Sequence, residues 1–302
     1  MTSSLVGSEM CIRDRNYIIK PLVCDKKVRK VRKMRIGSRD FATTGHTYIM
    51  GILNVTPDSF SDGGKFNQID AALKHVEEMI GDGADVIDIG GESTRPGYTK
   101  ISDEEETGRV VPVIEAVKKE FEIPISVDTY KSGVAEAAAQ AGADLINDIW
   151  GLKYDARMAE VIAKSGLACC LMHNRDNTEY RNFMEDVKQD LRETIALAKA
   201  AGIADDKIIL DPGVGFAKSY ENNLEVIRRL KEFNELKYPV LLGTSRKSVI
   251  GLTLDLPAAE RVEGTIVTTV MAVEAGCMFV RVHDVKENHR AIQMAEAILD
   301  RK

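Results

Sequence analysis

From about residue 48 onward, short runs of apolar, mostly β-branched residues alternate with longer stretches in which apolar residues recur at helical spacing. The short runs predict strands over residues 48–53, 86–89, 125–128, 145–147, 168–172, 208–211, 240–242 and 278–282. The longer stretches predict amphipathic helices over residues 69–81, 103–121, 132–141, 156–165, 183–201, 223–233, 261–275 and 286–299. Regular alternation of this kind is typical of an α/β fold with a parallel sheet.

Eight strand–helix repeats favour a closed (β/α)8 barrel, the TIM barrel, over an open sheet, since such barrels typically have about 250 residues. Glycine-containing turns precede five of the strands, at residues 81–85, 141–145, 164–168, 200–204 and 274–278. Glycine in this position is the expected left-handed C-cap of a helix that enters a short loop. The turns therefore support the same element boundaries.

The N-terminal part of the chain lacks this pattern. It contains the basic run KKVRKVRKMR at residues 26–35, and a run of like charges is more often a solvated tail than an anion-binding site. The opening SSLVGSEMCIRDR, residues 3–15, resembles a translated sequencing adapter. We expect residues 1–33 to be a non-native or disordered extension. Residues 34–302 should form a single domain, in which Met34 begins a hairpin that leads into the first barrel strand.

Composition narrows the range of functions. A net charge of -6 and a pI near 5.6 give no general attraction for polyanions, so nucleic acid is not the expected partner. No apolar run approaches the length of a membrane span, and no segment resembles a signal peptide, so we expect a cytoplasmic protein without membrane contact. The five cysteines form no CxxC pair, which favours reduced, structural thiols.

Polar residues end the predicted strands, where the active site of a (β/α)8 barrel lies. In chain order they are Asn54, Asp88, Asp128, Asn147, His173, Asp211, the GTSRKS segment at 243–248, and Arg281 with His283. A single Asn or Asp at such a place is explained as well by a turn or a helix cap as by function. Polar residues at every strand end are much harder to explain as turns. We therefore predict one site at the barrel mouth.

Residue types divide this site into two groups. Asp128, Asn147, Asp211 and Lys247 offer acceptors and donors that suit the edge of a flat heterocycle with N–H groups and a carbonyl. Asn54, Arg95, Arg281 and His283 suit a phosphate or pyrophosphate with Mg²⁺. A lone histidine is more often structural, but Arg281 two positions earlier places both side chains on one face of the strand.

Seven segments of the chain resemble, in order, the motifs of the dihydropteroate synthase family. They are MGILNVTPDSFSDGG, IDIGGESTRPG, SVDT, INDI, LDPGVGF, GTSRKS and RVHDV. The resemblance covers roughly residues 48–285, and the NVTPDSFSDGG and GGESTRPG segments are long and unusual enough to be highly specific. It implies a pterin-binding TIM-barrel transferase that joins dihydropterin pyrophosphate to p-aminobenzoate.

The resemblance also implies roles for individual residues. Asp128, Asn147, Asp211 and Lys247 would bind the pterin, with Asp88 among the substrate-binding residues; Asn54, Arg281 and His283 would bind pyrophosphate, with Asn54 also reaching Mg²⁺; Phe60, Thr94, Arg95, Pro96, Phe216 and Ser245 would surround p-aminobenzoate. The catalytic residues would be Asp128, Lys247, Arg281 and His283. A homodimer and competition by sulfonamides are implied as well.

Physical reasoning favours a dissociative substitution. An electron-rich dihydropterin delocalises positive charge at its exocyclic methylene, Mg²⁺ with Arg281 and His283 stabilises the departing pyrophosphate, and Asp128 stabilises the cation. The aryl amine is already a neutral nucleophile and needs no strong base.

Two features depart from the family pattern. The segment MHNRDNTEY, residues 172–180, places Asn174 where an apolar pterin neighbour is frequent. Thr244 stands where small or apolar residues are common, which we interpret as a tolerated variation.

Two other functions are compatible with parts of the sequence. A pterin-binding protein without synthase activity should lack the anion-binding residues or the loop after the first strand, and this chain retains them. A barrel enzyme that acts on another phosphorylated metabolite fits the GTSRKS loop weakly. That interpretation leaves Asp128, Asn147 and Asp211 unexplained.

Overall fold

The computed structural model describes residues 33–56, 65–93 and 100–301. An eight-stranded parallel sheet lies at its centre, in the order β8-β7-β6-β5-β4-β3-β10-β9. The strands are β3 (Tyr48–Asn54), β4 (Val86–Gly90), β5 (Ile125–Asp128), β6 (Leu145–Asp148), β7 (Ala168–Met172), β8 (Ile208–Asp211), β9 (Leu241–Gly243) and β10 (Phe279–Val282). A parallel bridge between Leu210 and Val240 joins β8 to β9 and closes the barrel. The predicted TIM barrel is confirmed.

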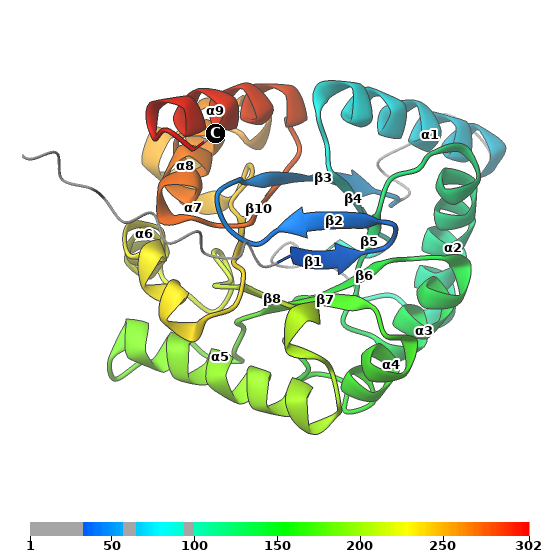
Figure 1. The fold of residues 1–302 in the computed structure, drawn as a ribbon, viewed down its shortest axis with the longest axis horizontal. Helices are drawn as coiled ribbons and strands as arrows, with labels where there is room; N and C mark the ends of the chain where they lie inside the picture. Colours follow the sequence, from blue (N-terminus) through cyan, green and yellow to red (C-terminus); the bar gives the residue numbers. More distant parts are fainter. Residues whose placement is uncertain (1–32, 57–64, 94–99, 302) are drawn as a thin grey trace, which may run out of the picture. The chain divides into compact units, whose positions relative to one another are not determined.

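Helices surround the barrel on its outside (Figure 1). They are α1 (Lys65–Asp82), α2 (Asp103–Glu120), α3 (Ser132–Ala141), α4 (Met158–Ser165), α5 (Phe183–Ala200), α6 (Tyr220–Arg228), α7 (Ser248–Leu254), α8 (Val262–Ala275) and α9 (Val285–Ile298). Short 3-10 segments lie at η2 (Asp205–Lys207), η3 (Leu230–Leu236) and η4 (Ala258–Glu260). The five predicted glycine turns all contain a glycine with positive φ, as the C-cap interpretation requires.

Two differences from the predicted elements have physical reasons. The helix predicted over 223–233 ends at Arg228, and η3 follows it. Leu230, Phe233 and Leu236 are buried in η3 at a spacing of three, which is the repeat of a 3-10 helix. Helix α7 was not predicted, because the run SVIGLTL is short and contains β-branched residues and a glycine, all weak helix formers.

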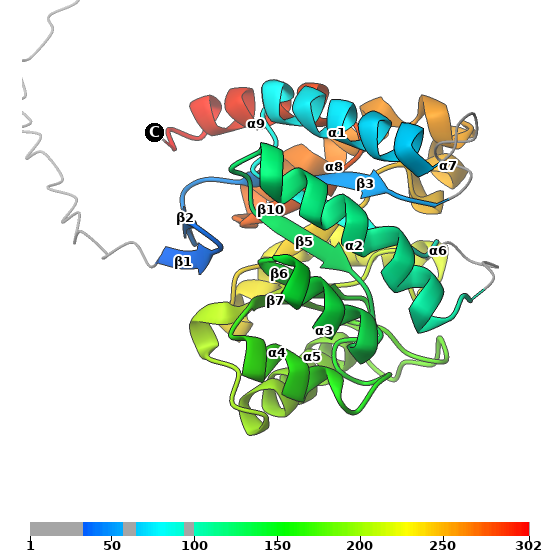
Figure 2. The ribbon, with the colours of Figure 1, turned by 90° about the vertical axis from the view of Figure 1, so that its right-hand side faces the viewer.

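An N-terminal hairpin closes one end of the barrel. Strands β1 (Lys33–Ile36) and β2 (Arg39–Ala42) pair antiparallel, as predicted, and lie on the side where β3 and β5 begin (Figure 2). Their buried side chains share one apolar cluster with residues near the starts of the barrel strands: Met34, Ile36, Phe41, Met50, Val86, Leu145, Ala168, Cys170, Ile209, Leu241, Met278 and Phe279. The hairpin therefore covers the N-terminal end of the barrel and leaves its C-terminal end for the site.

Two sequence expectations concern cysteines and membranes. Cys169, Cys170 and Cys277 are buried free thiols, and burial raises the pKa of each of them, so they belong to the apolar interior. Within the described ranges, no helix is both long enough and apolar enough to cross a membrane.

Phe41→Ala should lower the free energy of unfolding by about 3–5 kcal/mol, the usual cost of truncating a buried aromatic side chain. Phe41 is fully buried, and its ring centroid lies 4.9 Å from that of Tyr48 and 5.5 Å from that of Phe279.

A chain that begins at Met34 should unfold at the same urea concentration as the full chain, because Lys33 is an exposed end of β1. Urea titrations of the three proteins check both statements, and a destabilised short chain would contradict the proposed dispensability of residues 1–33.

Candidate active site

The C-terminal ends of neighbouring strands carry one row of polar residues. The strand registers pair Asn54 with Gly90, Gly90 with Asp128, and Asp128 with Asn147. Gly90 lies between the two polar side chains, since a Cβ atom there would be 3.7 Å from Asn54 Oδ1 and 3.6 Å from Asp128 Cβ, both ordinary contact distances. Asn54 and Asp128 thus flank the same point at the barrel mouth.

Arg281 joins two carboxylates from different strands. Its Nε lies 2.5 Å from Asp88 Oδ2, and its Nη2 lies 2.8 Å from Asp128 Oδ2. Asp88 also accepts hydrogen bonds from Ser126 Oγ at 2.5 Å and from Asn147 Nδ2 at 3.3 Å. Arg281, from the predicted anion group, is therefore bonded to Asp128 of the predicted heterocycle group and is connected through Asp88 to Asn147.

Asp128 is incompletely satisfied in this network. Its Oδ1 atom is buried and has no hydrogen-bond partner among the residues that the structure describes. Burial raises the pKa of Asp128 to about 7; Arg281 opposes this shift and the neighbouring Asp88 adds to it. A buried acceptor without a donor is costly, so Asp128 is well placed to accept one from a ligand.

Asp211 and Lys247 lie on either side of the turn at 212–216. Gly213 N donates to Asp211 Oδ1 at 2.7 Å, while Lys247 Nζ donates to the carbonyl oxygen of Val214. Lys247 Nζ also lies 4.6 Å from the centroid of the Phe216 ring. Burial raises the pKa of Asp211 and lowers that of Lys247 to about 8. The two side chains present an acceptor and a donor without pairing directly.

Ser245 orients His283. Ser245 Oγ accepts from His283 N at 3.1 Å and lies 3.0 Å from His283 Nδ1. The hydroxyl proton can be donated to Nδ1 in the tautomer that carries the ring proton on Nε2. A histidine in this tautomer offers an N–H donor to an anion.

Comparison with known proteins identifies the family. The pattern described as "Pterin binding enzyme" matches residues 50–283. The chain is 63% identical over 269 residues to the dihydropteroate synthase of Clostridium beijerinckii, covering 89% of this chain and 100% of that protein. The chain belongs to the dihydropteroate synthase family.

Solved structures of the family agree with this assignment. The dihydropteroate synthase of Clostridium difficile, determined in the presence of pteroic acid, is 54% identical with a TM-score of 0.84, covering 86% of this chain and 99% of that one. The Yersinia pestis enzyme, in complex with a sulfonamide drug, is 42% identical with a TM-score of 0.83, covering 89% of this chain and 100% of that one. The family resemblance seen in the sequence is confirmed, and with it the transferase class.

Four residues of the family motifs lie outside the described residues, and one predicted strand-end residue, His173, has other partners than the site residues. Phe60, Thr94, Arg95 and Pro96 lie outside the described residues. His173, at the end of β7, directs its ring to Asp190 at 2.9 Å and to Lys218 at 2.8 Å. Its bonding partners are thus other than the predicted site residues.

The family motifs also contain charged residues whose role sequence reasoning missed. Lys131 Nζ lies 2.8 Å from Glu92 Oε2 and 2.7 Å from Glu106 Oε2. Arg246, with φ of 58°, pairs through Nε with Asp284 Oδ2 at 3.1 Å. The available signal was their position, since Glu92, Arg246 and Asp284 stand inside the motifs themselves. These ion pairs hold the loops that carry the site.

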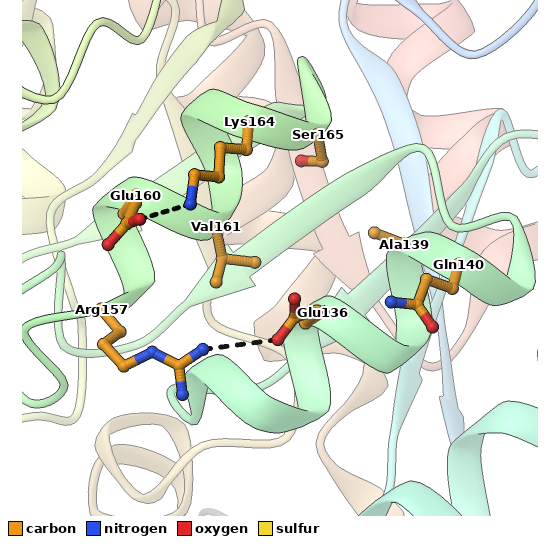
Figure 3. A pocket seen from close by; sticks show the side chains of 8 residues that line it. All are labelled: Glu136, Ala139, Gln140, Arg157, Glu160, Val161, Lys164 and Ser165. Carbon is orange, nitrogen blue, oxygen red and sulfur yellow. Dashed lines mark hydrogen bonds and ion pairs between the residues drawn. The ribbon is translucent and has the colours of Figure 1, made fainter.

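A separate pocket lies on the outer helical layer (Figure 3). It has a volume of about 240 Å³ and is lined by residues of α3 and α4 and of the turn before α4: Glu136, Ala139, Gln140, Arg157, Glu160, Val161, Lys164 and Ser165. Arg157 pairs with Glu136 at 3.4 Å and Lys164 with Glu160 at 2.5 Å, both between exposed side chains. None of the strand-end residues contributes to this pocket.

The raised pKa of Asp128 predicts a pH-dependent stability difference between the parent and Asp128→Asn. Because the pKa rises from 3.8 to about 7 on folding, the native state binds more protons between these values. The contribution of Asp128 to the free energy of unfolding is therefore largest at low pH and is lost as the pH rises toward 7. Relative to the parent, Asp128→Asn should therefore gain stability over this range, by at most about 1.4 kcal/mol per unit of pKa shift.

Asp155→Asn is the matched control for this measurement. Desolvation would raise the pKa of Asp155, but hydrogen bonds from Ser132 and Arg157 and the charge of Arg157 lower it below 3.8. Its protonation therefore changes mainly below about pH 4, and the stability difference between this variant and the parent should stay nearly constant between about pH 4 and 7. Urea unfolding at several pH values between about 4 and 7 measures both differences. A constant difference for Asp128→Asn would disprove the raised pKa.

Proposed function

We propose that this chain condenses 7,8-dihydropterin-6-ylmethyl pyrophosphate with p-aminobenzoate to give 7,8-dihydropteroate and pyrophosphate. The chain is a dihydropteroate synthase family member, and the main support is Asp128 Oδ1, which has no partner among the described residues, together with Asp211 and Lys247 at the same barrel mouth. Pteroic acid, in whose presence the Clostridium difficile structure was determined, is a compound of the type that this reaction forms.

The pterin binds along the carboxylates at the strand ends. Asp128 and Asp211 accept hydrogen bonds from its ring and amino N–H groups, while Lys247 and Asn147 donate to its acceptors. Asp88 orients this surface, because it accepts hydrogen bonds from Asn147 Nδ2 and Arg281 Nε and so holds both side chains in place. A charged acceptor and a matching donor fix the orientation of a planar ligand.

Pyrophosphate binds next to Arg281 and His283, with Mg²⁺ near Asn54. The described residues contain no cluster of three His, Cys, Asp or Glu side chains that could hold a metal by themselves. One amide oxygen beside a phosphate site still fits Mg²⁺, which is commonly bound by few protein ligands together with substrate phosphates and water. When bound, Mg²⁺ neutralises charge on the pyrophosphate.

The aryl substrate stacks beside Phe216, close to Ser245. The family resemblance assigns to the same substrate four residues of the two long loop motifs that lie outside the described ranges: Phe60, Thr94, Arg95 and Pro96. A sulfonamide resembles p-aminobenzoate in shape and competes for the same place, which the Yersinia pestis complex supports.

The reaction is a dissociative substitution at the pterin methylene. The C–O bond to pyrophosphate breaks with its electron pair on the leaving oxygen, and the amine nitrogen supplies the pair for the new C–N bond before losing one proton. Arg281 and His283 stabilise the leaving group, and the Asp128 carboxylate stabilises the cation. Lys247 holds the pterin in register with the amine.

A homodimer is proposed from an apolar surface on α7, α8 and α9. Exposed side chains there are Leu252, Leu254, Val267, Val270, Met294, Ile298 and Leu299. Exposed apolar residues concentrated on neighbouring helices mark an interaction surface. Val267→Lys with Met294→Lys should shift the chain from dimer to monomer in sedimentation equilibrium; a parent that sediments as a monomer would contradict the proposal.

A single-turnover assay tests the proposed reaction. Enzyme in excess over dihydropterin pyrophosphate, with p-aminobenzoate and Mg²⁺, should form dihydropteroate within one turnover. Asp211→Ala and Lys247→Ala should each weaken binding of the pterin substrate by about 1–3 kcal/mol, because each leaves buried polar groups unpaired. The dependence of the single-turnover rate on enzyme concentration measures this loss.

Lys199→Ala is the control variant, since Lys199 is an exposed residue of α5 paired only with Asp205 at 3.3 Å among the described residues. It should react like the parent. Pterin binding without product would identify a binding protein that lacks synthase activity. If the chain neither binds the pterin substrate nor forms product, the result favours a barrel enzyme that acts on another phosphorylated metabolite.

A further inference from the structure

Lys218, in the loop between β8 and α6, has its ammonium among three acceptors. Nζ lies 2.8 Å from His173 Nδ1, 2.9 Å from the carbonyl oxygen of Gly213 and 3.0 Å from that of Phe216. An ammonium has three N–H donors, so these acceptors use all of them. The described part of the chain offers it no carboxylate within ion-pair distance. Lys218 is thus bonded to a turn and a ring.

The backbone of this turn has an unusual conformation. Gly213, Gly215 and Ala217 all have positive φ, of 71°, 86° and 48°. Gly213 also packs closely, because a Cβ atom there would lie 2.0 Å from the carbonyl oxygen of His173. Ala217 is the residue for which a left-handed conformation is unfavourable. The hydrogen bonds from Lys218 therefore stabilise a turn whose backbone conformation is not favoured by its own residues.

The same turn carries the groups assigned to the substrates. Gly213 N holds the Asp211 carboxylate at 2.7 Å, and Phe216 provides the ring beside Lys247. Lys247 binds the carbonyl of Val214, which lies between the two carbonyls that Lys218 binds. A change at Lys218 therefore alters the support of Asp211, Phe216 and Lys247 together.

His173 gives Lys218 a neutral acceptor. Because the ammonium can only donate, His173 Nδ1 must accept, and the ring proton lies on Nε2, which donates to Asp190 at 2.9 Å. Burial lowers the pKa of His173 to about 4, so the ring remains neutral. Arg175 binds the same Asp190 at 2.5 Å and holds it in place.

Lys218 also acts on Asp211 through its charge. Burial lowers the pKa of Lys218 to about 7, so its ammonium is charged below about pH 7. Asp211 on β8 and Asp190 on α5 oppose this shift, whereas Lys247 after β9 and Arg175 after β7 add to it. Burial raises the pKa of Asp211, and the lowering influences are Lys247, the Gly213 hydrogen bond, Lys218 and Arg281. Removing the Lys218 charge therefore removes one of the influences that lower the pKa of Asp211.

We infer that Lys218 is a positioning residue of the pterin pocket: its ammonium holds the 213–216 turn so that Asp211, Phe216 and Lys247 are prearranged, and its charge favours the ionised Asp211 that accepts pterin N–H groups. This inference rests on the proposed pterin site. Lys218 itself touches neither substrate in this scheme.

Calorimetric titration with 6-hydroxymethyl-7,8-dihydropterin, across a range of pH, tests the inference in the full chain. Lys218→Met should weaken binding by roughly tenfold, about 1.4 kcal/mol. As the solution is acidified, Lys218→Met should also lose its affinity for the dihydropterin at a higher pH than the parent does. The reason is that Asp211 protonates more readily without the Lys218 charge. Lys218→Gln retains donors without the charge, and should show a smaller loss of affinity with a similar displacement of the pH profile.

Lys218→Arg retains the charge and should restore the parent pH profile, while Lys199→Met, on the exposed face of α5, should match the parent throughout. If Lys218→Met does not fold, the Gln and Arg variants carry the comparison. Unchanged affinity and pH profile in a folded Met or Gln variant overturns the inference. A uniform loss of affinity without displacement also overturns it, because it leaves Lys218 a structural role only. A parent chain that binds no dihydropterin refutes the proposed function, and this inference with it.

Discussion

Closure of the parallel sheet is the constraint on which the site depends. The last strand, β10, pairs with the first barrel strand, β3, as well as with β9, and the bridge between Leu210 and Val240 completes the ring. Arg281 can then reach Asp88 and Asp128, which are 193 and 153 residues earlier in the chain. Without the pairing of β10 with β3, Arg281 would lie away from β4 and β5, and these three side chains would not meet.

The two ends of the barrel are stabilised by different physical effects. At the N-terminal end, the hairpin residues Met34, Ile36 and Phe41 join an apolar cluster, so hydrophobic burial maintains the structure there. At the C-terminal end, carboxylates and cations replace apolar side chains. Buried ion pairs contribute little net stability, because desolvation offsets their attraction. The charged residues at this end therefore contribute less to the stability of the fold than the apolar cluster does.

Loops that present the pocket residues are held by charged side chains that are not themselves assigned to ligands. Lys131 joins Glu92 to Glu106 near the start of α2 and to the carbonyl of Ile101, and so connects both sides of the loop after β4. Arg246 and Asp284 connect the loops after β9 and β10. Supporting contacts of this kind keep binding groups in a productive geometry, which explains why charged residues other than ligands occur within the motifs.

The sequence by itself determined the barrel, the presence of an N-terminal hairpin, the glycine C-caps and the family, because these depend on local periodicity, turn chemistry and motifs that are contiguous in the chain. It also placed Asn54, Asp128, Asn147 and Asp211 at strand ends, which the structure brings to one rim. Tertiary structure alone decided how the side chains pair. Arg281 bridges Asp88 and Asp128, and His173 turns to Asp190 and Lys218, because strand stagger and loop packing set those distances. Pairings between residues far apart in the chain leave no periodic signal in the sequence, so only the closed barrel reveals them.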